Sequence, residues 1–238
     1  MSLLDFDYLI ISNQRLNTGS LQDTLFFFHE LGIRTVVLTV RYNRERYTPA
    51  YFFDRLRTLK EEVRNIRPRG MNLVVCPEIQ MTDGIAEDSV LSRLRANRSE
   101  YLFINLPLFH WDDRLDADLN RILFQKHLCP IFTGFESNMK TNSPAQLERL
   151  ARSRSFIGCF DLVYLTSLSA HEPLIHLLLN DTPILPCISH DLSDYAGVID
   201  GFHDLKNRIG NKRYVDLCRT MQRCNHEIIA RIANRSPS

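Results

Sequence analysis

The chain has no long apolar run and almost no net charge. None of its uninterrupted apolar stretches approaches the roughly 18 residues that a membrane-spanning helix needs. Its 29 lysine and arginine residues face 28 acidic residues, which leaves a formal net charge of +1 and no overall field that would gather nucleic acid. The first ten residues, MSLLDFDYLI, lack a basic region and carry Asp5 and Asp7 where a secretion signal would be apolar. We therefore expect a cytoplasmic protein with no membrane span and no nucleic-acid partner.

Several catalytic signatures are also missing. The nine glycines form no GxGxxG or Walker phosphate loop, and the chain has no GxSxG nucleophile elbow. The cysteines form no CxxC pair and no recognisable phosphatase loop, and mostly apolar neighbours indicate buried free thiols. They are Cys76, Cys129, Cys159, Cys187, Cys218 and Cys224. These absences argue against nucleotide-loop enzymes, serine hydrolases and cysteine phosphatases.

The chain does contain seven short apolar, β-branched runs, each separated from the next by a segment that can form a helix. This alternation predicts βα units and a parallel sheet, and the near-continuous apolarity predicts strands that are buried on both faces. We expect one α/β domain over residues 1–238, built as a distorted seven-unit (β/α)7 barrel. The expected strands are Tyr8–Ser12, Thr35–Val40, Leu73–Ile79, Tyr101–Pro107, Pro130–Phe135, Phe160–Thr166 and Ile184–Ser189.

Turn and cap residues delimit the helices between these strands. Thr18 or Ser20 can cap a helix that runs to Leu31, with Gly32 ending it. Further helices are predicted from Pro49 to about Arg67, from Ser143 to about Ser153, and from Lys212 to Ala233. Basic residues near the end of the helix from Pro49, including Arg64 and Arg67, interact favourably with the helix dipole. We interpret them as a solvent-exposed helix terminus.

The strand ends carry a set of ordered motifs that resembles one known family. GIRTVVLTVRY (Gly32–Tyr42) resembles the GI-(K/R)-T-(I/V)-x-x-T-P-H-Y of the PHP superfamily, in particular of its CpsB/YwqE-like branch of manganese-dependent protein-tyrosine phosphatases. In chain order, VVCPEIQMTDG resembles that branch's G-x-E-I, SEYLFINLP its s-x-Y-x-L-I-E-x-P, CPIFTGFES its P-I-I-A-H-P-E-R, and PCISHDLSDY its S-D-A-H. The resemblance implies a distorted seven-unit barrel and a setting beside capsule or exopolysaccharide machinery.

The departures from this family concern its metal ligands. The resemblance implies three metal ions held by histidines and carboxylates, with a bridging hydroxide as the nucleophile. Here the first-strand H-x-H falls near Ile11 to Asn13, where neither residue is a histidine. The histidine of T-P-H-Y is replaced by Arg41, and that of H-P-E-R by Gly134. The carboxylates Glu78 and Glu136 remain. Because a guanidinium cannot ligate a metal, the sequence predicts a largely dismantled metal site.

Two hypotheses follow. In the first, the chain is a degenerate, non-catalytic or weakly active pseudo-phosphatase without a metal or other cofactor, which binds an anionic small molecule or a phosphorylated protein segment in the former active-site cleft. In the second, it is a phosphoric monoester hydrolase, either with one residual manganese or zinc ion at Glu78, His190 and Asp191 or without metal. Neither hypothesis assigns further catalytic residues. We expect Arg41 and Glu78 to approach each other, and expect the ligand-binding residues to be Asn13, Arg41, Glu78, Asn105, Glu136, His190 and Asp191.

Overall fold

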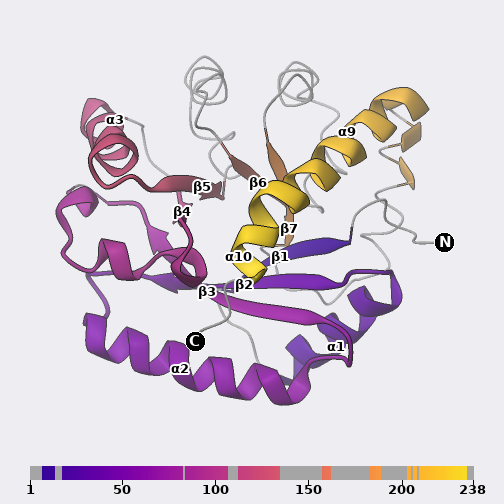
Figure 1. Cartoon of the computed structure of the whole chain (residues 1–238), viewed down its shortest axis with the longest axis horizontal. Coiled ribbons are helices and arrows are strands. Elements are labelled where there is room, and N and C mark those ends of the chain that lie inside the picture. Colours follow the sequence, from indigo (N-terminus) through magenta and orange to yellow (C-terminus); the bar gives the residue numbers. More distant parts are fainter. Residues whose placement is uncertain are drawn as a thin grey trace.

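Seven parallel strands form a closed barrel in which the strands follow one another in chain order (Figure 1). The computed structural model describes residues 7–13, 18–82, 84–106, 112–134, 157–161, 183–188, 203–204, 206–207 and 209–234. The strands are β1 (Tyr8–Asn13), β2 (Thr35–Tyr42), β3 (Asn72–Gln80), β4 (Tyr101–Asn105), β5 (Cys129–Thr133), β6 (Gly158–Asp161) and β7 (Ile184–Ile188). Pairing of β1 with β7 closes the ring. The predicted barrel is therefore confirmed.

The strand limits differ from the predicted ones at a few ends. The fifth strand ends at Thr133 because Gly134 has a φ of +70°, which is a left-handed conformation that leaves the sheet. The sixth begins at Gly158, two residues before its predicted start, because Gly158 pairs with both Phe132 and Ile184. The part of this predicted strand beyond Asp161 lies outside the described residues.

Two helices follow β1 and β2 as their cap residues predict. In α1 (Thr18–Glu30), Leu21, Leu25 and Phe28 are fully buried at a spacing that places them on one helix face. Gly32 then turns the chain with a φ of +100°. In α2 (Pro49–Ile66), the Thr48 side chain caps the first turn by accepting a hydrogen bond from the Tyr51 backbone.

The connections after β3 contain short turns that the sequence pattern does not announce. Three 3-10 turns, η1 (Ile85–Glu87), η2 (Leu91–Arg93) and η3 (Ala96–Arg98), lead to β4. Helix α3 (Asp113–Asn120) continues into the π-turn η4 (Arg121–Gln125) before β5. These turns extend the core, because their apolar residues are buried, among them Ile85, Leu91 and Ile122.

The predicted C-terminal helix is divided by a π-turn. It comprises α9 (Asn211–Cys224), η5 (Asn225–Ile229) and α10 (Ala230–Asn234). The predicted inner face is confirmed at Cys218, Met221, Ile228 and Ile232, which are all buried. Helix α9 packs against β7 and α10 against β3. No helix of the described chain has the length and apolarity to cross a membrane, and the predicted helix from Ser143 lies outside the described residues.

Candidate functional site

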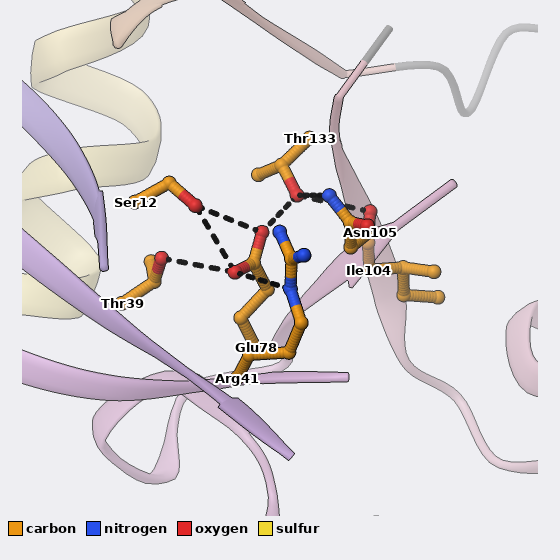
Figure 2. Close-up of polar contacts among 7 residues, drawn as sticks. All are labelled: Ser12, Thr39, Arg41, Glu78, Ile104, Asn105 and Thr133. Carbon is orange, nitrogen blue, oxygen red and sulfur yellow. Dashed lines mark hydrogen bonds and ion pairs between the residues drawn. The ribbon is translucent and has the colours of Figure 1, made fainter. Parts of the chain in front are cut away.

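The carboxylate of Glu78 lies fully buried near the carboxyl end of β3. Three hydroxyl groups donate hydrogen bonds to it (Figure 2). Ser12 Oγ lies 3.1 Å from Oε2 and 3.3 Å from Oε1, Thr39 Oγ1 lies 3.5 Å from Oε2, and Thr133 Oγ1 donates to Oε1. Both carboxylate oxygens thus have donors, as a buried charge requires.

The strands that supply these groups place the carboxylate inside the barrel. Ser12 belongs to β1 and Thr133 to β5, and neither strand is a direct neighbour of β3 in the sheet. Side chains from strands two places away on either side can meet only across the interior of the closed ring. Ser12, Thr39 and Thr133 are all buried, so the hydroxyl groups replace the water that would otherwise solvate Glu78.

A guanidinium faces the same carboxylate from β2. Arg41 and Glu78 are register partners in the parallel pair of β2 and β3, and Arg41 Nε lies 3.5 Å from Glu78 Oε2. The predicted approach of these residues is therefore confirmed, although the contact is a single ion pair through Nε and not a two-pronged one. Glu78 is completely covered, whereas the Arg41 side chain keeps 22% of its surface exposed. The pair thus connects the barrel interior to solvent.

Asn105 lies one hydrogen bond further from the carboxylate. Its Nδ2 donates to Thr133 Oγ1 at 3.3 Å, which leaves the hydroxyl proton of Thr133 for Glu78. The next residue in the chain after Thr133 is Gly134, where an added Cβ would lie 2.8 Å from Asn105 Nδ2. Together with the φ of +70°, this contact disfavours a side chain at the position where the family resemblance has a histidine, because Asn105 would have to shift and the backbone would be strained.

We call these six residues the Glu78 cluster: Ser12, Thr39, Arg41, Glu78, Asn105 and Thr133. Three of the predicted ligand-binding residues, Arg41, Glu78 and Asn105, belong to it. Asn13 is the last residue of β1. Glu136, His190 and Asp191 lie outside the described residues. For all seven residues, ligand binding stays a prediction.

The described members of the cluster do not fit the multinuclear metal centre that the family resemblance implies. Hard divalent ions prefer several carboxylate, carbonyl or imidazole donors, and among the described residues no three His, Cys, Asp or Glu side chains gather closely enough to hold a metal. The oxygens of Glu78 already accept three hydroxyl hydrogen bonds. A guanidinium 3.5 Å away would also repel a dication. The donor set therefore suits a guanidinium and not a cluster of metal ions.

The cysteine nearest to Glu78 along β3 is not a candidate nucleophile. Cys76 is completely buried, and burial raises the pKa of its thiol to about 12. The thiolate is the reactive form of cysteine, so a thiol with this pKa is almost wholly protonated near neutral pH. The predicted burial of a free thiol is confirmed at this position.

The three hydroxyl residues of the cluster were not predicted as site residues. Each of them is a polar residue within an apolar strand: Ser12, Thr39 and Thr133. The alternation of side chains along each strand could have identified them as inward-facing. Thr39 stands two residues before Arg41, so the period of two places both side chains on the same face of β2. Polar residues on the inward face of several strands, at similar distances from the strand ends, mark a polar barrel interior.

Comparison with known proteins bears on the fold alone. No protein-family model matches the chain, and no curated protein sequence matches it. The structure is similar to one from the pair YwqE of Bacillus subtilis and CpsB of Streptococcus pneumoniae, which are metal-dependent tyrosine phosphatases. The TM-score is 0.62 and the identity 15%, over 87% of this chain and 88% of that one.

Two other solved structures match more weakly. One is the DAHP synthase of Thermotoga maritima, with a TM-score of 0.46, 12% identity and coverage of 86% of this chain and 70% of that one. The other is a β-N-acetylhexosaminidase of Bacteroides fragilis, with a TM-score of 0.34, 14% identity and coverage of 77% and 50%. Neither carries an argument about function. The resemblance to the CpsB/YwqE branch that the ordered motifs predicted is thus confirmed at the level of the fold.

Proposed function

We propose that this protein is a pseudo-phosphatase: a barrel with the fold of the CpsB/YwqE tyrosine phosphatases that hydrolyses phosphoesters weakly or not at all. Its strand-end cleft would bind an anionic small molecule or a phosphorylated protein segment. The observation that supports this proposal best is the contact of Arg41 with the buried carboxylate of Glu78. A permanent cation stands where a metal-dependent phosphatase needs a ligand.

The loss of catalysis follows from what a guanidinium can and cannot do. A metal ion in such a site neutralises the phosphate and also lowers the pKa of a bound water toward 7, which creates the nucleophile. A guanidinium can neutralise the phosphate but has no coordination site for water. The Glu78 carboxylate could in principle act as a base, yet it is fully buried and accepts three hydroxyl hydrogen bonds. The protein would therefore still bind phosphoesters without hydrolysing them.

Anion binding would centre on Arg41. Its side chain is partly exposed at 22%, and a guanidinium presents a planar array of donors that matches phosphate and carboxylate geometry. Because Glu78 balances one positive charge, Arg41 alone would bind an anion weakly, so further donors are needed. Asn105 belongs to the same cluster, and Asn13 and His190 are the other donors that the sequence predicts at the strand ends.

The test combines hydrolysis and binding on the same preparations. We expect p-nitrophenyl phosphate and a phosphotyrosine peptide to be hydrolysed negligibly in excess manganese, far below the roughly 1 per second typical of enzymes. We expect calorimetry to detect peptide binding by wild type and a loss of at least about tenfold in Arg41→Ala. Arg57→Ala removes an exposed cation that pairs with Asp54 and serves as the matched control. Arg41→Lys, which keeps the charge, guards against a variant that fails to fold.

The residual-metal hypothesis predicts the opposite results. Elemental analysis of protein purified without chelator would then find about one manganese or zinc ion per chain, and Glu78→Gln would remove both the metal and the turnover. Enzymatic rates in wild type would overturn the pseudo-phosphatase proposal. Equal peptide binding by Arg41→Ala and wild type would show that the cleft has been assigned to the wrong residues. A cytoplasmic role beside capsule or exopolysaccharide machinery forms part of this proposal and rests on the family resemblance alone.

A further inference from the structure

A pocket with polar and apolar walls lies at the amino end of β3, away from the Glu78 cluster. It is a pocket of about 310 Å³ between the last turns of α2, the first residues of β3 and the end of α10. Val63, Leu73 and Val75 contribute apolar surface, and Asn72 lies at the rim as an exposed residue. Small-molecule sites have volumes of about 300–1,000 Å³ and combine apolar walls with a few polar groups, so the pocket falls at the lower end of that range.

Three cations of α2 line this pocket. Lys60, Arg64 and Arg67 stand four and three residues apart, which places them on one face of the helix. Among the described residues, no carboxylate forms an ion pair with any of the three. By contrast, Arg57 of the same helix pairs with Asp54. The described part of the chain therefore gives these three cations no ion-pair partner.

The helix dipole does not account for this cluster. The helix dipole acts within about the last turn, so in α2 it stabilises Arg64 and Arg67 near the helix end and does not account for Lys60, six residues before Ile66. Three full positive charges outweigh the partial charge of about −0.5 at the helix end, so the pocket as a whole attracts anions. The interpretation of Arg64 and Arg67 as a merely solvated helix end is thus incomplete, because both line a concave surface with an apolar floor.

We propose that this pocket binds a small organic phosphate, with the phosphate held by Lys60, Arg64 and Arg67 and the organic body against the apolar floor. Arginine binds phosphate with two parallel hydrogen bonds, and lysine acts as a point charge. An inorganic anion would leave the floor uncovered, and a neutral molecule would leave the cations unused. The nearby Cys76 thiol is buried and is not expected to react, so the ligand is held non-covalently.

Calorimetry on the full chain tests the proposal with four defined probes: AMP, phenyl phosphate, adenosine and inorganic phosphate. At least one of the two organic phosphates should bind about tenfold or more tightly than both adenosine and inorganic phosphate, since only an organic phosphate uses both halves of the pocket. Arg64→Ala and Arg67→Ala should each weaken that binding about tenfold. Arg57→Ala, on the same helix but outside the pocket, should leave it unchanged.

Two further variants distinguish binding in this pocket from plain charge attraction and from binding at the Glu78 cluster. Asn72→Trp fills the pocket from an exposed rim position and should abolish organic phosphate binding at this pocket while the three cations remain. Arg41→Ala removes the cation of the Glu78 cluster, so it should remove only a phosphate site at that cluster and leave unchanged the binding that Asn72→Trp abolishes, which separates this proposal from the pseudo-phosphatase proposal. Thermal melting of every variant verifies that it is folded.

Three outcomes would overturn the proposal. The first is no detectable binding of either organic phosphate at about 1 mM. The second is inorganic phosphate binding as tightly as the organic probes, which would mean that the apolar floor contributes nothing. The third is a short single-stranded RNA that binds more tightly than either organic phosphate and loses affinity in the same variants, which would identify the cations as a nucleic-acid surface.

Discussion

The two ends of β3 differ in how their charged side chains are buried and paired. At its carboxyl end, Glu78 is fully buried, and its charge is met by Arg41 and three hydroxyl groups. At its amino end, Lys60, Arg64 and Arg67 border an open pocket, and no carboxylate of the described residues forms an ion pair with them. A buried charge without partners costs several kcal/mol, whereas water solvates an exposed one cheaply. At the first end Glu78 already occupies part of the positive charge, and only the partly exposed Arg41 remains for a ligand. At the second end all three cations face the pocket without an ion-pair partner among the described residues.

Removing the cation from the buried end should have the largest effect on stability. Arg41→Met deletes the charge that faces Glu78 at 3.5 Å and leaves the carboxylate buried without it. We expect a loss of about 2–4 kcal/mol in the free energy of unfolding, below the full cost of breaking a buried pair because Arg41 is partly exposed. Urea denaturation measures the loss. Adding Glu78→Gln should restore most of it, and a double variant no more stable than Arg41→Met would contradict the ion pair's role.

Gly134→Ala should be the next most damaging change. The added Cβ would meet Asn105 Nδ2 at 2.8 Å, at a φ of +70° that L-residues rarely adopt. A loss of about 2 kcal/mol is expected. Asn105→Ala in the same chain relieves the clash but not the backbone strain, so the double variant should recover part of the loss. Gly70→Ala, with a φ of +87° and no atom within 4 Å of the added Cβ, is the control for strain alone.

Thr133→Val keeps the shape of the side chain and removes its hydroxyl. Glu78 Oε1 would lose one donor and Asn105 Nδ2 its acceptor, at a cost of about 1.5–3 kcal/mol for a hydrogen bond to a charged group, less the gain from a buried methyl. A net loss of about 1–2 kcal/mol in urea denaturation is expected. Thr58→Val on α2, whose exposed hydroxyl donates to the Asp54 carbonyl, should change stability by less than about 0.5 kcal/mol. Similar losses at the two positions would contradict the special status of the cluster.

Alkaline pH should lower the free energy of unfolding through Cys76, which lies on the same strand as Glu78, by less than the substitutions above. Burial raises the pKa of Cys76 to about 12, so the folded state keeps its proton after the unfolded chain has lost it. The stability from this thiol is complete below about pH 8.5, the usual thiol pKa, and declines above it by up to about 1.4 kcal/mol per pH unit. Between pH 9 and 10, wild type should lose about 1 kcal/mol more than Cys76→Ala. Parallel declines in the two proteins would exclude the thiol as the cause.

The exposed pair of Asp54 and Arg57 should show the smallest effect. Both side chains are about 70% exposed, and exposed pairs three residues apart on a helix contribute roughly 0.3–0.5 kcal/mol. Asp54→Asn should therefore change the free energy of unfolding by less than about 0.5 kcal/mol, and less still in high salt. A loss as large as that of Arg41→Met would mean that burial does not control the cost of removing a partner.

The barrel and part of the cluster could be predicted because strand parity and end position follow directly from sequence. Arg41 and Glu78 each lie near the end of an apolar run, and parallel register makes them neighbours. The hydroxyl groups of Ser12 and Thr133 were harder to predict, because their contact with Glu78 crosses the barrel and depends on how the ring closes. The pocket beside α2 could not be predicted from the sequence, because the cations line a pocket only where α10 packs against β3.

Closure of the barrel also has a consequence for synthesis on the ribosome. Ile10 of β1 pairs with Cys187 of β7, so the first strand cannot gain its second neighbour until the seventh has been made. At roughly 5–20 residues per second, that interval is about 10–35 s. During it, β1 and β2 can already pair, while the outer edge of β1 presents unpaired backbone groups that attract other strands. The nascent chain should therefore need protection by chaperones mainly before the seventh strand emerges.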